Sequence, residues 1–117
     1  MTIWKEAMEV AESIFEMTKK LPRSEDYGLT SQIRRSALSI AGNIAEAFGR
    51  YHLNDKINFY YFSRGSVAET SSHLEYGARV GYFDREQSTI ISEKLDNVFE
   101  EINRLIKSLK YQPQPQS

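Results

Sequence analysis

Cysteine is absent from this sequence of 117 residues. Its absence excludes disulfide bridges, thiolate metal sites and a cysteine nucleophile. Long apolar runs are also missing, because no stretch reaches the ~18 consecutive apolar residues that a membrane-spanning helix requires. The first segment, MTIWKEAMEVAESIFE, has acidic residues spread along it, whereas a signal peptide has a cationic start and a continuous apolar run. We therefore expect a cytoplasmic protein with no membrane partner.

Neither sign of charge predominates in the chain. Fifteen Lys and Arg residues stand against 16 Asp and Glu, which gives a formal net charge of −1, and the balance is even along the sequence. No basic tail or half is therefore present to attract phosphate groups. Contact with nucleic acid would need a basic patch assembled in three dimensions, for example by repetition around an oligomer. A hydrophobic content of 40% argues against disorder, and the length fits one domain.

Sequence motifs of catalysis are lacking as well. The chain has no HExxH, GxSxG, phosphate-binding loop or dinucleotide-binding glycine pattern. His52 falls in a predicted turn. His73 follows Glu69 by four residues, whereas dimetal carboxylate bundles require a Glu-x-x-His pair on each of two helices. We predict a protein that is not an enzyme and that has no catalytic residues, metal or cofactor.

Apolar residues recur with helical spacing along four segments, and residues that favour helix ends separate these segments. In chain order the end residues are Pro22 after the first helix, Thr30 and Gly49 around the second, Asn54 and Gly81 around the third, and Asp84 before the fourth. Gln87 follows Asp84 by three residues, as in a capping box. The predicted core face of the first helix consists of Trp4, Ala7, Met8, Ala11, Ile14, Phe15 and Thr18, widened by Ile3, Val10 and Met17.

Long helices with short links and no strand-like alternation predict an all-α fold, an antiparallel up-down-up-down four-helix bundle over residues 1–111. The remaining residues, 112–117, alternate Gln and Pro, which is incompatible with a helix. We predict that this tail is disordered.

The second and third helices have apolar or small residues on more sides than one core requires. Between Arg35 and Glu46 the outward positions of the second helix are Ser39 and Gly42, where a solvated helix usually carries charge. The third helix has one series of Ile57, Tyr60, Arg64, Val67, Ser71, Leu74 and Ala78, and a second of Phe59, Phe62, Ser66, Glu69, His73, Tyr76 and Val80. The simplest cover for the second series is another copy of the chain, in a closed ring or dimer. Alternatively, both helices are the buried diagonal of a lone bundle, whose interior the small residues fit.

Charged residues near these series are the candidate site residues. Arg64 falls on a mostly apolar series and needs a partner, with Glu46 and Glu69 as candidate acids and Asn43 as a neutral acceptor. The alternative is that Arg64 or Arg35 binds a ligand phosphate. The predicted buried ion-pair or interface set is Arg35, Glu46, Arg64, Glu69, Gly42, Phe59 and Phe62. The candidate nucleic-acid contacts are Arg34, Arg35 and Arg50, and we expect Arg34 to be freer than Arg35.

Two segments are distinctive together. LPRSEDYGLTSQIRRSALSIAGNIAEAFGR, followed by FYYFSRGSVAETSSHLEYGARVGYFD, resembles the bacterial four-helix-bundle proteins encoded within intervening sequences of 23S ribosomal RNA genes. That resemblance extends to about Lys110 and implies a homopentamer. It also implies a fold similar to the accessory protein of diversity-generating retroelements, which binds a reverse transcriptase and nucleic acid. RNA or an RNA-binding protein thus becomes a candidate partner, and the resemblance brings no enzymatic activity with it.

One departure from the family pattern bears on the second helix. The family usually has Pro in a "SIP.NIAEG" segment and Gly after its Glu, where this chain has Ala41 and Ala47. Alanine retains the backbone N–H that proline lacks, so we expect a straighter second helix. The leading hypothesis is a non-catalytic homo-oligomeric scaffold for RNA or an RNA-binding partner. Its rival is a protein-interaction module with no nucleic-acid contact.

Overall fold

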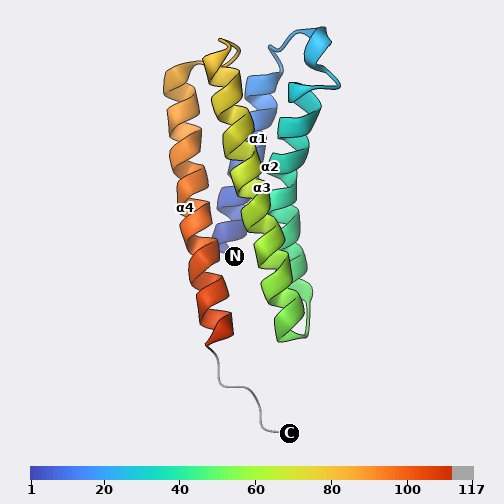
Figure 1. The fold of residues 1–117 in the computed structure, drawn as a ribbon, viewed down its shortest axis with the longest axis vertical. Coiled ribbons are helices and arrows are strands. Elements are labelled where there is room, and N and C mark those ends of the chain that lie inside the picture. The colour runs from blue at the N-terminus through green and yellow to red at the C-terminus, as the bar shows by residue number, and fades with distance from the viewer. Residues whose placement is uncertain (112–117) are drawn as a thin grey trace, which may run out of the picture.

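The computed structural model describes residues 1–111, which form an all-α bundle (Figure 1). Its elements are α1 (Thr2–Thr18), the short 3-10 helix η1 (Arg23–Glu25), α2 (Leu29–Gly49), α3 (Leu53–Arg79) and α4 (Arg85–Lys110). The four long helices alternate in direction, and each packs against two neighbours: α2 lies between α1 and α3, and α4 lies between α3 and α1. This arrangement confirms the predicted four-helix bundle. The predicted disordered tail, 112–117, lies outside the described residues.

The core consists mainly of buried aliphatic side chains, joined on α3 by Tyr60 and by the buried hydroxyl residues Ser63 and Thr70. On α1 it follows Ile3, Ala7, Val10 and Ile14. The predicted core face of α1 is therefore partly wrong, because Trp4 and Phe15 lie on its exposed edge, and Phe15 is 47% exposed. Apolar residues cover more than half of the circumference of α1, so periodicity alone did not determine which of them faces the neighbouring helices.

Two of the predicted helix ends are confirmed by local geometry. The carboxylate of Asp84 accepts a hydrogen bond of 3.0 Å from the backbone N–H of Gln87, which caps the first turn of α4. Gly81 has φ of +86°, the left-handed conformation that glycine adopts at little cost. This conformation allows the N–H groups of Tyr82 and Phe83 to reach the carbonyl of Gly77 at 2.9 and 3.1 Å. The α3–α4 turn is therefore closed by its own backbone.

Two other predicted N-caps are wrong. Helix α2 begins at Leu29, so Thr30 lies inside it, and α3 begins at Leu53, one residue before Asn54. At α2 the backbone N–H of Leu29 donates instead to Glu25 Oε1, at 3.2 Å. An acceptor four residues upstream thus replaces the expected cap, because η1 folds Glu25 back over the start of α2.

Candidate functional site

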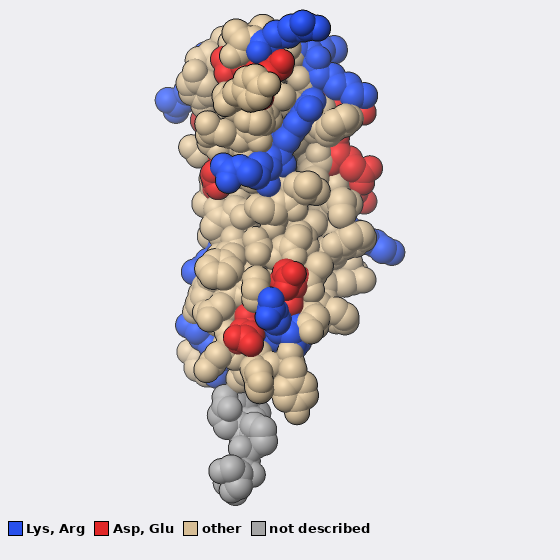
Figure 2. Space-filling view, turned by 90° about the vertical axis from the view of Figure 1, so that its right-hand side faces the viewer, with Lys and Arg blue, Asp and Glu red and all other residues tan. Residues whose placement is uncertain are grey.

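The outward side of α2 and α3 is open to solvent in the single chain. Gly42 and Gly65 are exposed, and a Cβ built at either position would meet no atom within 4 Å. Phe62, predicted to lie in a contact, is 58% exposed. Figure 2 shows the side of the bundle on which α2 lies in Figure 1: its middle has few charged side chains, with basic groups above and a mixed group below. We define the α3 outer face by Phe62, Gly65, Ala68 and Tyr76.

A second apolar surface lies between α1 and α2. We call it the α1–α2 shoulder and define it by Met8, Ala11, Phe15 and Leu38, which line an open groove of about 440 Å³. Leu38 is 58% exposed, although it lies near the middle of α2. Helical spacing did not indicate this surface, because Met8, Ala11 and Phe15 were predicted to belong to the core face of α1. The chain therefore exposes apolar groups on two different sides.

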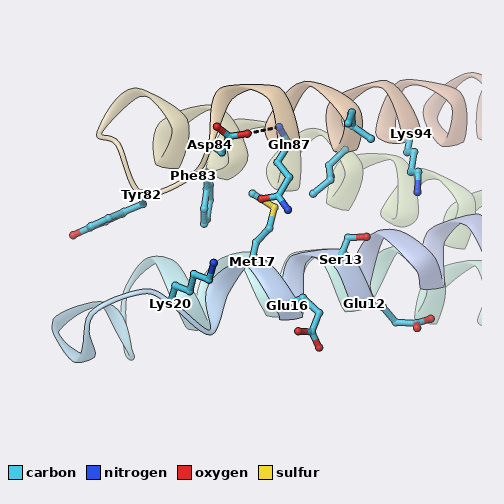
Figure 3. Close-up of a pocket in the computed structure, with 12 residues that line it drawn as sticks. Glu12, Ser13, Glu16, Met17, Lys20, Tyr82, Phe83, Asp84, Gln87 and Lys94 are labelled. Atoms are coloured by element: carbon cyan, nitrogen blue, oxygen red, sulfur yellow. Dashed lines mark hydrogen bonds between the residues drawn. The ribbon is translucent and has the colours of Figure 1, made fainter.

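The α1–α4 groove is a hollow with a volume of about 730 Å³ (Figure 3). Its floor is formed by Phe83 and Ile91, which are buried, and by the half-buried Met17. Lys20, in the turn that follows α1, and Lys94 of α4 line it as well. Sequence reasoning did not identify this groove, because its two walls come from opposite ends of the chain.

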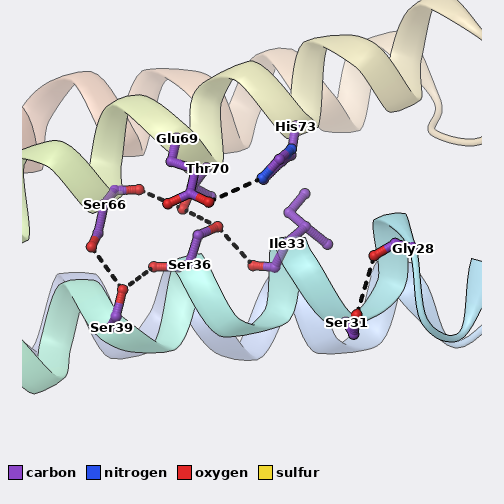
Figure 4. A network of polar contacts seen from close by, with 9 residues as sticks. All are labelled: Gly28, Ser31, Ile33, Ser36, Ser39, Ser66, Glu69, Thr70 and His73. Atoms are coloured by element: carbon purple, nitrogen blue, oxygen red, sulfur yellow. Dashed lines mark hydrogen bonds and ion pairs between the residues drawn. The ribbon is translucent and has the colours of Figure 1, made fainter.

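Beneath the outward side, α2 and α3 are joined by small polar side chains (Figure 4). The hydroxyl of Ser39 donates to Ser66 Oγ at 2.7 Å, and Thr70 Oγ1 lies 2.8 Å from Ser36 Oγ. Ser63, fully buried, donates to the carbonyl of Ile40 at 2.8 Å. Because these hydroxyls satisfy one another and the backbone, the polar seam is compatible with a dry interior. Part of the small-residue pattern therefore fits the inside of a single bundle, as the alternative interpretation held.

The two adjacent arginines, Arg34 and Arg35, lie in different environments. Arg34 is half-buried: its Nε donates to Thr18 Oγ1 at 2.6 Å, and its guanidinium lies 4.6 Å from the centroid of the Phe15 ring. The expectation that Arg34 would be the freer residue is therefore wrong. Arg35 is exposed and forms no ion pair with any residue in 1–111. Position 34 faces α1, whereas position 35 is turned one hundred degrees further, outward.

Arg50, Glu46 and Phe59 form one cluster at the opposite end of α2. Arg50 Nη2 lies 3.0 Å from Glu46 Oε2, the pair that four-residue spacing favours. The same guanidinium lies 4.6 Å from the centroid of Phe59, and Phe59 contacts Phe62 edge to face at 5.6 Å. The structure thus brings four predicted site residues together. Because Glu46 already neutralises Arg50, Arg35 is the more available cation for an anionic partner.

Arg64 does not form the predicted ion pair within the chain. Its Nη1 donates to Asn103 Oδ1 at 2.9 Å, and the guanidinium lies 4.9 Å from the Tyr61 ring centroid. Neither Glu46 nor Glu69 contacts it, because Arg64 faces α4, whereas Glu46 belongs to α2. Glu69 instead lies 3.5 Å from His73 Nε2. The partner of Arg64 is therefore an amide on α4, which helical spacing on α3 alone did not indicate.

An ion-pair cluster at the α3–α4 turn was not among the predicted sites. The carboxylate of Glu75 accepts hydrogen bonds from Arg79 Nε and from Arg85 Nη1, both at 2.8 Å. Hydrogen bonds from Arg85 and Arg79 hold the pKa of the Glu75 carboxyl at about 2, below its ordinary value of 4.5. The spacing of Glu75 and Arg79 was visible in the sequence, but the contact with Arg85 depends on the turn. The cluster links α3 to the first turn of α4.

No group of three or more His, Asp or Glu side chains within residues 1–111 is placed to hold a metal ion. None of the helices in this part of the chain is both long enough and apolar enough to cross a membrane.

Comparisons with known proteins agree with the fold. Residues 1–107 match the family described as 23S rRNA-intervening sequence protein. Among solved structures, the chain is similar to a crystal structure of a protein of unknown function from the S23 ribosomal protein family of Bacteroides thetaiotaomicron. The sequences are 26% identical, the similarity covers 90% of this chain and 98% of the other, and the TM-score is 0.81. No curated protein matches this chain.

Proposed function

The chain belongs to the 23S rRNA-intervening sequence protein family, and on this basis we propose that it is a non-catalytic, cytoplasmic homo-oligomer that acts as a scaffold for RNA or a ribonucleoprotein. The predicted resemblance is confirmed, while the oligomer and its RNA partner are the proposal. The observation that carries it is the presence of two uncovered apolar surfaces on one small bundle, the α3 outer face and the α1–α2 shoulder.

Two different apolar surfaces favour a ring over a two-fold dimer. In a two-fold dimer the same patch of both copies meets, so one surface is sufficient. In a cyclic ring, one surface of each copy meets a different surface of the next. Leu38 on one side and Phe62 on the other are each 58% exposed. We propose that these surfaces contact each other between copies in a closed ring, with five copies as the resemblance implies.

Light scattering during size-exclusion chromatography tests the assembly. We expect an oligomer at micromolar concentration and a monomer after Phe62→Glu, because the contact would bury an unpaired carboxylate. Asn97→Glu, on the exposed side of α4, adds the same charge away from both surfaces and is the matched control. A monomeric wild-type protein at this concentration contradicts the proposal.

Arg35 is the strongest candidate among the proposed RNA contacts, because its side chain is exposed and unpaired within the described residues. A ring repeats Arg35 once per copy, which would compensate for the near-zero net charge of the chain. Arg34 lies beside it but binds Thr18, and Arg50 binds Glu46. We therefore rank Arg35 above the other two predicted contacts.

Filter binding of a structured ribosomal RNA fragment tests this assignment. We expect Arg34→Glu combined with Arg35→Glu to weaken binding by about tenfold or more, and added salt to weaken wild-type binding steeply. Arg104→Glu combined with Lys107→Glu reverses two charges on α4 and is the control. An unchanged RNA affinity after the first double substitution removes these residues from the RNA contact.

A protein-interaction module without nucleic-acid contact is the second candidate. It is favoured by the net charge of −1 and by the apolar character of the exposed surfaces. The ratio of absorbance at 260 and 280 nm of the purified protein is the first measurement. Nucleic acid that copurifies supports the scaffold. A protein partner that stays bound after nuclease treatment supports the module.

A further inference from the structure

The α1–α4 groove has a preformed apolar floor. Phe83 is held in place on the α3 side, because its ring occupies the space next to the buried Gly77, where any Cβ would overlap it. Backbone hydrogen bonds to the carbonyl of Gly77 and the Asp84 cap fix the turn that carries Phe83. On the α4 side, Ile90 lies at the edge of the groove and is 51% exposed. A groove of about 730 Å³ with such a floor is in the size range of binding sites.

The charged side chains that line the groove differ in the direction in which they point. In Figure 3 the ammonium groups of Lys20 and Lys94 point into the space between α1 and α4, whereas the carboxylates of Glu12 and Glu16 point away from it. Neither lysine forms an ion pair with any residue of 1–111.

The acids that border the groove are already engaged or turned outward. Glu16 pairs with Lys19 at 3.1 Å, and Asp84 accepts from the N–H of Gln87. Glu12 and Glu16 also line the α1–α2 shoulder groove on the other side of α1. The inward charge of the groove is therefore positive at Lys20 and Lys94, and Met17, Ile90 and Ile91 line the groove together with the uncharged Gln87.

The spacing of the two lysines suggests the shape of a ligand. Lys20 lies at the C-terminal end of α1, beside the N-terminus of α4 where Asp84 lies, and Lys94 lies ten residues further along α4. At 1.5 Å per residue this separates the two charges by ~15 Å, or about three helical turns. A groove between two antiparallel helices, with apolar residues on its floor and charged residues at its borders, fits the two-sided character of an amphipathic third helix.

From this charge pattern, we infer that the α1–α4 groove binds an amphipathic helix of a partner protein, whose apolar face covers Met17, Ile90 and Ile91 and whose two flanking carboxylates meet Lys20 and Lys94. This site goes beyond the proposed scaffold function. The residues proposed to contact the helix are not among the candidate RNA contacts or the residues that define the α3 outer face and the α1–α2 shoulder, although Glu12 and Glu16 border both grooves. A result against the ring or against RNA binding therefore does not contradict the helix-binding site, and a result against the helix-binding site does not contradict the ring or RNA binding.

A designed peptide tests the inference with the full-length protein. The probe is a fluorescein-labelled helical peptide with leucines at alternating spacings of three and four, and one glutamate at each end of this apolar face, ~15 Å apart. Fluorescence anisotropy measures its dissociation constant. We expect saturable binding to the wild-type protein and a loss of about tenfold or more after Lys20→Glu combined with Lys94→Glu.

Two controls separate charge recognition from general effects. Lys5→Glu combined with Lys107→Glu makes the same charge change on α1 and α4 outside the groove, and we expect unchanged affinity. A probe with lysines in place of both glutamates should bind the wild-type protein weakly and the Lys20→Glu, Lys94→Glu protein more tightly. Ile90→Glu places a carboxylate at a position that is 51% exposed and removes an apolar contact, so it should weaken binding of the glutamate probe.

Three outcomes overturn the inference. The first is no saturable binding of the glutamate probe, and the second is equal binding of both probes to the wild-type protein. The third is an affinity for the glutamate probe that the Lys20→Glu, Lys94→Glu substitutions leave unchanged. If these substitutions weaken binding of poly(A) RNA and not of the probe, the groove is a nucleic-acid contact and the inferred protein helix is wrong.

Discussion

At Gly77, helix α3 approaches the ring of Phe83 so closely that no side chain fits between them. We predict that Gly77→Ala destabilises the protein by about 1–3 kcal/mol, although alanine favours helices over glycine, because overpacking displaces the ring. Urea unfolding followed by circular dichroism measures this change.

Phe83→Leu provides the control for this position, because leucine lacks the ring that the new methyl group would meet. In the Phe83→Leu background, we expect Gly77→Ala to be neutral or stabilising. The two substitutions should therefore show a coupling free energy in a double-mutant cycle. Equal costs of Gly77→Ala in both backgrounds contradict the proposed overlap.

Glu75 makes one part of the stability of the fold dependent on acid pH. Its pKa lies at about 2 because Arg85 and Arg79 hydrogen-bond to its charged form, compared with an ordinary value of 4.5. A depressed pKa stabilises the folded state above the unfolded value, and this contribution is lost as the pH falls through the folded value. The free energy of unfolding should therefore decrease between pH 4.5 and about 2.

Carbon-detected NMR titration of the Glu75 carboxyl measures this pKa directly. Arg85→Ala removes the first and strongest of its hydrogen-bond partners, so we expect the midpoint to rise toward the ordinary range. Arg104→Ala, which removes a remote arginine paired with Glu101, should leave the Glu75 midpoint unchanged. A midpoint of Glu75 that does not respond to Arg85→Ala contradicts the assignment.

Helix ends were predicted correctly where one residue and the backbone groups next to it determine the end. Asp84 caps α4 through a contact with a residue three positions on, and the turn at Gly81 joins Gly77 to residues only five and six positions on. The ends at Thr30 and Asn54 were predicted wrongly. At α2 the acceptor for the first turn is Glu25, which reaches Leu29 only because η1 bends the chain.

The Asp84 cap offers a direct test at the scale of one helix. Asp84→Ala leaves the N–H of Gln87 without its side-chain acceptor, and we expect a loss of about 1 kcal/mol in the free energy of unfolding. Asp84→Asn retains an oxygen acceptor and should cost much less. Urea denaturation compares the two, and an equal loss in both variants contradicts the capping role.

For the whole molecule, the proposed ring makes a prediction that a two-fold dimer does not. Leu38→Glu blocks the α1–α2 shoulder and Phe62→Glu blocks the α3 outer face, so each variant alone should be monomeric. A mixture of the two variants retains one intact surface on each partner. We expect light scattering of the mixture to show a heterodimer and no larger species. A mixture that stays monomeric contradicts pairing between these two surfaces.

The four helices and their antiparallel order could be predicted from the amino-acid sequence, because helical spacing and end signals are local properties of a few consecutive residues. The exposed edge of α1 that carries Phe15, and the contact of Arg64 with Asn103, depend on how the helices pack. Only the folded chain also brings Lys20 beside the first turn of α4 in the α1–α4 groove. Such contacts join residues distant in the chain, and their choice depends on how each helix is rotated against its neighbours.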